Sequence, residues 1–209
     1  MRRIPLLLLS TIALANGIQA ASWRALPELP RGGAGTVTGD GAAVAFTNFM
    51  GGTSYHSPVS SVAPWTKSRA DANTMSVVVR GNRIAYLVKN GGYNTVLYGA
   101  LGDTVLKTAS FGDMNSPLEG IDQDGHRILA VRGGSNSSLA FHLSTDTGEL
   151  AKGASAGTVQ AWRTLKMPSE FSNPGTARGW IEGRLVVAST ATKSYLSRDT
   201  GATWLESPT

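Results

Sequence analysis

Four short apolar runs recur along the chain, and each follows a tight turn that contains glycine. Glycine, Asn and Asp tolerate the positive φ angles that two-residue hairpin turns require. Each run is too short for a helix and is rich in Val, Ile, Leu and Ala, so it predicts a buried strand. The turns are Asp40-Gly41, Gly81-Asn82, Asp124-Gly125 and Glu182-Gly183, and the runs are Val44–Phe46, Ile84–Val88, Ile128–Val131 and Leu185–Ala188.

The spacing of these turns predicts the architecture. Gly41 and Gly81 are 40 residues apart, Gly81 and Gly125 are 44 apart, and Gly125 and Gly183 are 58 apart. A repeat of about 40 to 50 residues that holds four strands is typical of propeller blades. We therefore predict an all-β fold, a small β-propeller of about four four-stranded blades, either closed on itself or completed by a second copy as a homo-oligomer. A β-sandwich whose hairpins align is the alternative. The long third interval predicts an insertion around residues 151–177.

The carboxyl-terminal stretch SRDTGATW resembles the Asp-box, or BNR repeat, of sialidase-like β-propellers. The resemblance implies a hairpin clamp at the periphery of a blade, in which the Asp accepts backbone N–H groups, the Gly takes a positive φ and the Trp folds back over the hairpin. It implies a fold and not an active site. The motif residues are Ser197, Asp199, Gly201, Thr203 and Trp204, a weaker copy stands at Ser144, Asp146 and Gly148, and apolar residues follow the other three turns at a similar distance, at Trp65, Leu106 and Leu150.

The first 20 residues have the pattern of a secretory signal peptide. Arg2 and Arg3 precede an apolar run over residues 4–15, and the small residues Ala20 and Ala21 follow. Such a segment is too short to cross a bilayer comfortably and is removed on export. We therefore predict a signal peptide over residues 1–20, a domain over residues 21–209, and a periplasmic, cell-surface or secreted location with no stable membrane span after cleavage. A retained amino-terminal helix is the alternative, and it favours a structural protein of a virion or a surface appendage.

Composition narrows the range of partners. The chain has no cysteine, so it forms no disulfides. Its 19 Lys and Arg residues against 14 Asp and Glu residues give a formal net charge of +5, but the basic residues are scattered. Proteins that bind nucleic acid concentrate positive charge on one face, so we predict no nucleic-acid partner.

Candidate catalytic groups are sparse. Active members of the sialidase-like family carry an Arg-Ile-Pro motif early in the propeller, whereas here it occurs at residues 3–5, within the signal segment. The G-x-S-x-G pattern at residues 153–157 has no histidine after it, which a nucleophile elbow needs. The three histidines also lack metal-ligand spacing, and we predict no catalytic residue, metal or cofactor. Carboxylates that would supply a glycosidase pair are Glu119, Asp122, Asp124, Glu170 and Glu182, but the sequence does not give their separation.

Aromatic and basic residues in and near the insertion supply the candidate binding surface. Aromatic rings next to polar groups stack on sugars or anchor protein contacts, and segments between elements often carry function. We therefore favour an exported, non-catalytic recognition or assembly module that binds a glycan or a protein partner. A sialidase-like glycoside hydrolase, active or degenerate, is the alternative that the resemblance implies. The surface residues are Trp162, Arg163, Lys166 and Trp180.

Overall fold

The computed structural model describes most of the chain from residue 34 onward. The described residues are 34–40, 43–48, 54–58, 66–69, 73–90, 93–103, 105–110, 118–132, 140–144, 162–168, 171, 177–190 and 192–207. The signal peptide predicted over residues 1–20 lies outside them, so the signal segment and its cleavage stay predictions.

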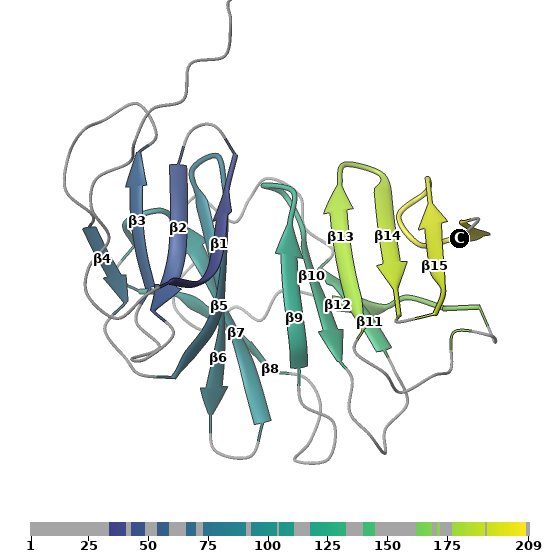
Figure 1. Ribbon diagram of the computed structural model, residues 1–209, viewed down its shortest axis with the longest axis horizontal. Coiled ribbons are helices and arrows are strands. Elements are labelled where there is room, and N and C mark those ends of the chain that lie inside the picture. The colour runs from purple at the N-terminus through teal and green to yellow at the C-terminus, as the bar shows by residue number, and fades with distance from the viewer. Residues whose placement is uncertain are drawn as a thin grey trace, which may run out of the picture.

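Sixteen strands in the described residues form four separate four-stranded sheets, and each sheet is an antiparallel meander of consecutive strands. We call the sheets blades 1 to 4 in chain order; in Figure 1 they fan out with blade 1 at one end and blade 4 at the other. Blade 1 consists of β1 (Ala34–Gly39), β2 (Ala43–Asn48), β3 (Ser54–Pro58) and β4 (Thr66–Arg69), and blade 2 of β5 (Thr74–Arg80), β6 (Arg83–Asn90), β7 (Tyr93–Ala100) and β8 (Lys107–Ser110). Blade 3 consists of β9 (Leu118–Gln123), β10 (Ile128–Arg132), β11 (Ala140–Ser144) and β12 (Trp162–Thr164), and blade 4 of β13 (Arg178–Glu182), β14 (Leu185–Ser189), β15 (Ser194–Ser197) and β16 (Leu205–Glu206).

Glycine-bearing hairpin turns join the first strand of each blade to the second. Gly81, Gly125 and Gly183 have φ angles of 55°, 87° and 55°, which residues with a Cβ rarely adopt. The apolar runs predicted after these turns form β6, β10 and β14. Gly41 lies outside the described residues, although β1 and β2 on either side of it pair in the same antiparallel way.

Neighbouring blades pack face to face, and we call each such contact a seam. In the seam between blades 2 and 3, Val78, Ala85 and Tyr98 of blade 2 share one buried cluster with Ile121 and Ile128 of blade 3. The seams between blades 1 and 2 and between blades 3 and 4 are built from two similar clusters. Stacked sheets are stabilised mainly by burial of apolar surface, at about 25 cal/mol per Å². The seams therefore hold the blades together.

Side-chain hydrogen bonds also tie the innermost strands of neighbouring blades to each other. Gln123 Nε2 donates to the Val78 carbonyl at 2.7 Å across the seam between blades 2 and 3. Asp122 Oδ2 accepts the Ile181 N–H at 2.8 Å across the seam between blades 3 and 4. An innermost strand has a sheet partner on one side only. The backbone N–H and C=O groups on its free edge therefore need other partners. These side chains supply them.

The predicted insertion around residues 151–177 contains a strand of the blade itself. β12 pairs with β11 and completes blade 3 as its outermost strand. Residues 145–161 and 172–176 lie outside the described residues, so the extent of an insertion stays a prediction.

Candidate functional site

The innermost strands of all four blades surround one hollow, which we call the inner groove. Its volume is about 630 Å³, and residues of β1, β5, β9 and β13 line it together. Side chains alternate along a strand, and each of these strands has one edge without a sheet partner. Some side chains and the free edge of every innermost strand therefore face the groove. The inner groove is therefore a surface that the blades build jointly.

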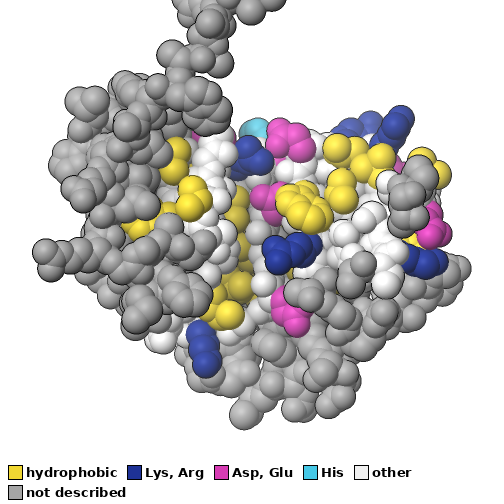
Figure 2. Space-filling view, in the orientation of Figure 1, with side chains coloured by type: hydrophobic (Ala, Val, Ile, Leu, Met, Phe, Trp, Pro, Cys, Tyr) yellow, Lys and Arg dark blue, Asp and Glu magenta, His cyan; other side chains and the backbone are white. Residues whose placement is uncertain are grey.

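Large apolar side chains are exposed in the inner groove. Val37 on β1 is 61% exposed, Met75 on β5 is 47% exposed and Trp180 on β13 is 48% exposed. Glu119 on β9 and Arg178 on β13 are also exposed and add one charge of each sign. Figure 2 shows apolar, basic and acidic side chains close together on one face of the molecule. Extended apolar surface of this kind typically marks a binding site.

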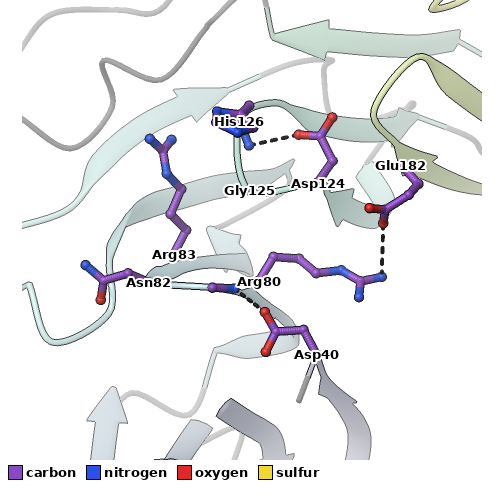
Figure 3. A pocket seen from close by; sticks show the side chains of 9 residues that line it. Asp40, Arg80, Asn82, Arg83, Asp124, Gly125, His126 and Glu182 are labelled. Carbon is purple, nitrogen blue, oxygen red and sulfur yellow. Dashed lines mark hydrogen bonds and ion pairs between the residues drawn. The ribbon is translucent and has the colours of Figure 1, made fainter. Parts of the chain in front are cut away.

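A second hollow, the rim pocket, adjoins the groove and is lined by the hairpin turns of the blades. Its volume is about 490 Å³. Figure 3 shows Arg80 directed at Glu182, at a distance of 3.9 Å, and Asp40 accepting a backbone N–H from the turn of blade 2. The His126 backbone N–H donates to Asp124 Oδ1 at 2.8 Å. Since Glu182 is exposed and Arg80 is partly exposed to solvent, their pair contributes at most about 1 kcal/mol. The contacts of the rim pocket mainly hold the turns in place.

The carboxylates considered for glycoside cleavage are divided between the two hollows: Glu119 and Asp122 line the inner groove, and Asp124 and Glu182 line the rim pocket. Asp122 is buried in the seam between blades 3 and 4, and burial raises the pKa of its carboxyl group even though it accepts the Ile181 N–H. Asp124 accepts two backbone N–H groups of its own turn and the Arg127 guanidinium at 3.2 Å. Glu119 lines the inner groove, and residue 170 lies outside the described residues. The hydrogen bonds of Asp122 and Asp124 are therefore structural ones.

Side chains of the SRDTGATW stretch hold the turn between β15 and β16. The Ser197 hydroxyl donates to Asp199 Oδ1 at 2.7 Å and accepts the Gly201 N–H at 2.7 Å. The two Asp199 oxygens accept the Thr203 hydroxyl at 2.6 Å and the Thr203 N–H at 2.8 Å. These bonds, led by that of the Thr203 hydroxyl, favour the charged form and hold the pKa of the Asp199 carboxyl well below its usual value. Gly201 has a φ of 86°, which suits glycine.

Trp204 connects blade 4 to blade 3, whereas the motif implied an indole lying over its own hairpin. Its indole N–H donates to the Lys166 carbonyl at 3.0 Å, in the segment that follows β12. The half-buried ring packs against the cluster of the seam between these blades. Leu165 reaches the same bend, since a Cβ added to Gly201 would lie 2.8 Å from Leu165 Cδ1. The bend therefore fastens a seam as well as a hairpin.

The weaker copy of the motif is described in part. Ser144 is buried, and its Oγ accepts the Ile128 N–H at 2.8 Å. Leu106 is partly buried and precedes β8, as Trp204 precedes β16. The remaining residues of this comparison lie outside the described residues: Asp146, Gly148, Trp65 and Leu150.

The structure separates Trp180 from the other three residues of the predicted binding surface, which lie on β12 and just after it. Trp162, on β12, is half-buried against the seam between blades 2 and 3. Arg163, on the same strand, donates to the carbonyl and the hydroxyl oxygen of Thr200. Lys166 follows β12 and is exposed. Trp180 lies apart from them on β13, in the inner groove.

Sequence reasoning did not single out three exposed residues of the inner groove, and it named Glu119 only as a carboxylate for glycoside cleavage. A signal for the three was present, because each lies four to six residues before the glycine of a hairpin turn. These three residues are Val37, Met75 and Arg178.

Comparison with solved structures identifies the architecture. The structure of YCF48 from Cyanidioschyzon merolae, a β-propeller protein, matches 89% of this chain with a TM-score of 0.54 and 15% sequence identity. The fold is a β-propeller. The propeller described here spans 63% of the YCF48 chain. The crystal structure of the tricorn protease matches 84% of this propeller and 18% of its own chain, with a TM-score of 0.43 and 15% identity.

The prediction of an all-β propeller with four four-stranded blades is confirmed. No protein-family model matches the sequence of this propeller, and a search of curated proteins found no match. The resemblance to the Asp-box therefore depends on the motif residues themselves and stays a prediction. Among the described residues, no helix is long and apolar enough to cross a membrane.

Proposed function

We propose that this propeller is an exported, non-catalytic recognition module that holds a segment of a protein partner in its inner groove. The observation that carries the proposal is the joint exposure of Val37, Met75 and Trp180 in one hollow. Aromatic residues and methionine are enriched at the centres of protein interfaces, where they anchor the partner. Export is supported by the signal-peptide pattern of residues 1–20.

The lining of the inner groove favours a peptide over a sugar. Two of its three exposed apolar side chains, Val37 and Met75, have no ring that a sugar would stack on. Apolar pockets with a few well-placed polar groups suit side chains of a partner. Glu119 and Arg178 carry opposite charges, which would fix the direction of a bound segment. The partner chemistry that fits is an extended segment with an apolar residue flanked by charged ones.

Site-specific photo-cross-linking tests the proposal. Benzoylphenylalanine is placed at Met75 in the groove and, as a matched control, at Val105, which is 65% exposed in the turn before β8 and does not line the groove. We expect one protein partner to be captured from position 75 and not from position 105. Equal capture from both positions would contradict the proposal.

The captured partner is then purified, and its affinity is measured by calorimetry. Met75→Asp and Arg178→Glu should each raise the Kd at least about tenfold, a change of about 1.4 kcal/mol. Val105→Asp should leave the Kd unchanged. Unaltered binding by Met75→Asp would contradict the assignment of the groove, and groove-dependent binding on a glycan array in place of a protein would overturn the choice of a peptide. Mass spectrometry of the mature amino terminus tests export, since an intact Met1 on the exported protein contradicts cleavage.

A further inference from the structure

In the described residues, one position of the repeat faces the preceding blade in every seam. It lies four residues before the turn glycine, and we call it the seam position. In blade 2 it is Val77, fully buried against blade 1, and in blade 3 it is Ile121, 9% exposed against blade 2. In blade 4 it is Gly179, where an added Cβ would lie 2.7 Å from Leu129 Cδ2 of blade 3. In blade 1 it is Val37, which is 61% exposed, and within the described residues no blade precedes it.

The surface that receives the seam position is a row of four residues, one from each strand, that lie opposite one another in the strand register. Leu129 and Leu143 form the middle of this row in blade 3 and are buried under blade 4. Ala85 and Tyr98 hold the same places in blade 2 and are buried under blade 3. From the innermost strand outward, the rows are Thr38, Ala45, His56 and Thr66 in blade 1; Val78, Ala85, Tyr98 and Lys107 in blade 2; Asp122, Leu129, Leu143 and Arg163 in blade 3; and Trp180, Val187, Leu196 and Leu205 in blade 4.

The row of blade 4 is left uncovered by the described residues. Trp180 is 48% exposed and Leu205 is 63% exposed, while Val187 and Leu196 are half-buried. This row is apolar from end to end, whereas the rows of blades 2 and 3 end on a Lys and an Arg. The free face of blade 4 therefore has the chemistry of a seam, and among the described residues no blade covers it.

We propose that blade 1 of a second copy of this chain packs on the free face of blade 4. The existing seams indicate this occupant. Val37 is the seam position of blade 1, and the row of blade 4 is the kind of row on which a seam position packs. Gly179 lies over Leu129 in the seam between blades 3 and 4, and the counterpart of Leu129 in blade 4 is Val187. Val37 of the partner subunit therefore packs on Val187. This inference rests on the seams and not on the proposed function. It places Val37 and Trp180 at the contact between the copies, so Met75, Glu119 and Arg178 are exposed residues of the inner groove that stay free for a partner.

Two copies give a closed assembly. The contact joins two different faces, so each chain contributes blade 4 to one contact and blade 1 to the other, and a two-fold axis makes the two contacts equal. Two arcs of four blades give eight blades, the upper end of the range of about four to eight that is common in propellers. A ring closed within one chain would need β1 beside β13, but in Figure 1 these strands stand apart with β9 between them.

Light scattering during size-exclusion chromatography tests the assembly. We expect the purified protein to elute with twice the mass of one chain, and Leu205→Asp to elute with the mass of one chain. Val105→Asp places the same charge at an equally exposed residue of blade 2 and should keep the double mass. Circular dichroism of each variant shows whether the fold is intact. A monomeric wild type, or a folded Leu205→Asp variant that keeps the double mass, would overturn the proposal.

Cysteine cross-linking tests which faces meet. The chain has no cysteine, so Val37→Cys and Val187→Cys variants each carry one thiol. We expect a short bismaleimide to link the two variants to each other when they are mixed, and to link neither variant to itself. Linkage of Val187→Cys to itself would show that two copies of blade 4 meet face to face and would overturn the proposal. Met75→Asp should stay dimeric. A failure of the proposed partner binding in the groove can therefore be distinguished from a failure of the proposed dimer.

Discussion

A single methyl group in the seam between blades 3 and 4 should cost a measurable part of the propeller's stability. The position is Gly179 on β13, whose φ is negative or extended, so alanine is conformationally allowed there. An added Cβ would lie 2.7 Å from Leu129 Cδ2, 2.9 Å from Phe141 Cε1 and 3.0 Å from Val131 Cγ2. Non-bonded carbon atoms normally approach to about 3.5–4.0 Å. The methyl group therefore needs space that three side chains already fill.

The size of the effect follows from two opposing contributions. Overpacking of a dense core typically costs about 1–3 kcal/mol. Alanine also restricts the unfolded chain relative to glycine, which stabilises the folded state by about 0.4–1 kcal/mol. The three crowding side chains come from the two strands β10 and β11, so rotation of one of them does not relieve all the contacts. We expect Gly179→Ala to lower the free energy of unfolding by about 1–2 kcal/mol.

Urea unfolding, followed by tryptophan fluorescence and circular dichroism, measures this free energy. It is done at one protein concentration, because the proposed dimer makes stability depend on concentration. The matched control is Gly120→Ala, on the innermost strand β9, where an added Cβ has no atom within 4 Å; its free energy of unfolding should change by no more than about 0.5 kcal/mol. If Gly179→Ala is as stable as the wild type, or Gly120→Ala loses as much, then blades 3 and 4 do not approach as closely as described.

Three further substitutions test the seams. Trp204→Phe keeps a half-buried ring but loses the hydrogen bond to the Lys166 carbonyl, and it should lose about 1 kcal/mol in urea unfolding; an unchanged value would show that this bond contributes nothing. Burial raises the pKa of Asp122, so the folded protein holds this proton more tightly than the unfolded chain, and stability falls as the pH rises above the usual value of 3.8. Asp122→Asn keeps an acceptor for the Ile181 N–H and should be at least as stable as the wild type at about pH 7, whereas a clear loss would mean that the negative charge itself is needed. Burial and then the nearby Arg132 lower the pKa of His142, so as the pH falls below 6.5 the unfolded chain takes up the proton first and stability is lost. Thermal melts between about pH 7 and pH 5 should show a smaller decline for His142→Gln, and parallel curves would contradict this account.

The strands could be predicted from local sequence because their signals are local. A turn glycine followed by a short Val, Ile and Ala run leaves the chain few alternatives to a hairpin. The residues of the inner groove depend instead on which side chains the neighbouring blades leave uncovered. On β5 the consecutive residues Val77, Val78 and Val79 are all buried, because blades 1 and 3 cover both faces of the sheet, and this hides the alternation that would have marked Met75 as exposed.

The grouping of Trp180 with Trp162 shows the same limit. Both are large aromatic residues near the predicted insertion, and closeness in sequence favoured a shared surface. The register places Trp162 on the outermost strand of blade 3 and Trp180 on the innermost strand of blade 4. Where a residue lies in a propeller depends on which strand of its blade it occupies. The strand pairing gives that strand number, and closeness in sequence does not.

The attachment of Trp204 to the preceding blade has a mechanical consequence. β16 has two residues and meets β15 through two register pairs, so by itself it would resist little force. A pull on the carboxyl end, from a fused domain or a bead in an optical trap, loads β16 first and then the indole, which passes it through the Lys166 carbonyl to the segment after β12. Tension applied to the last strand is thus shared between two sheets, and a short, taut fusion at this end would strain the junction between them.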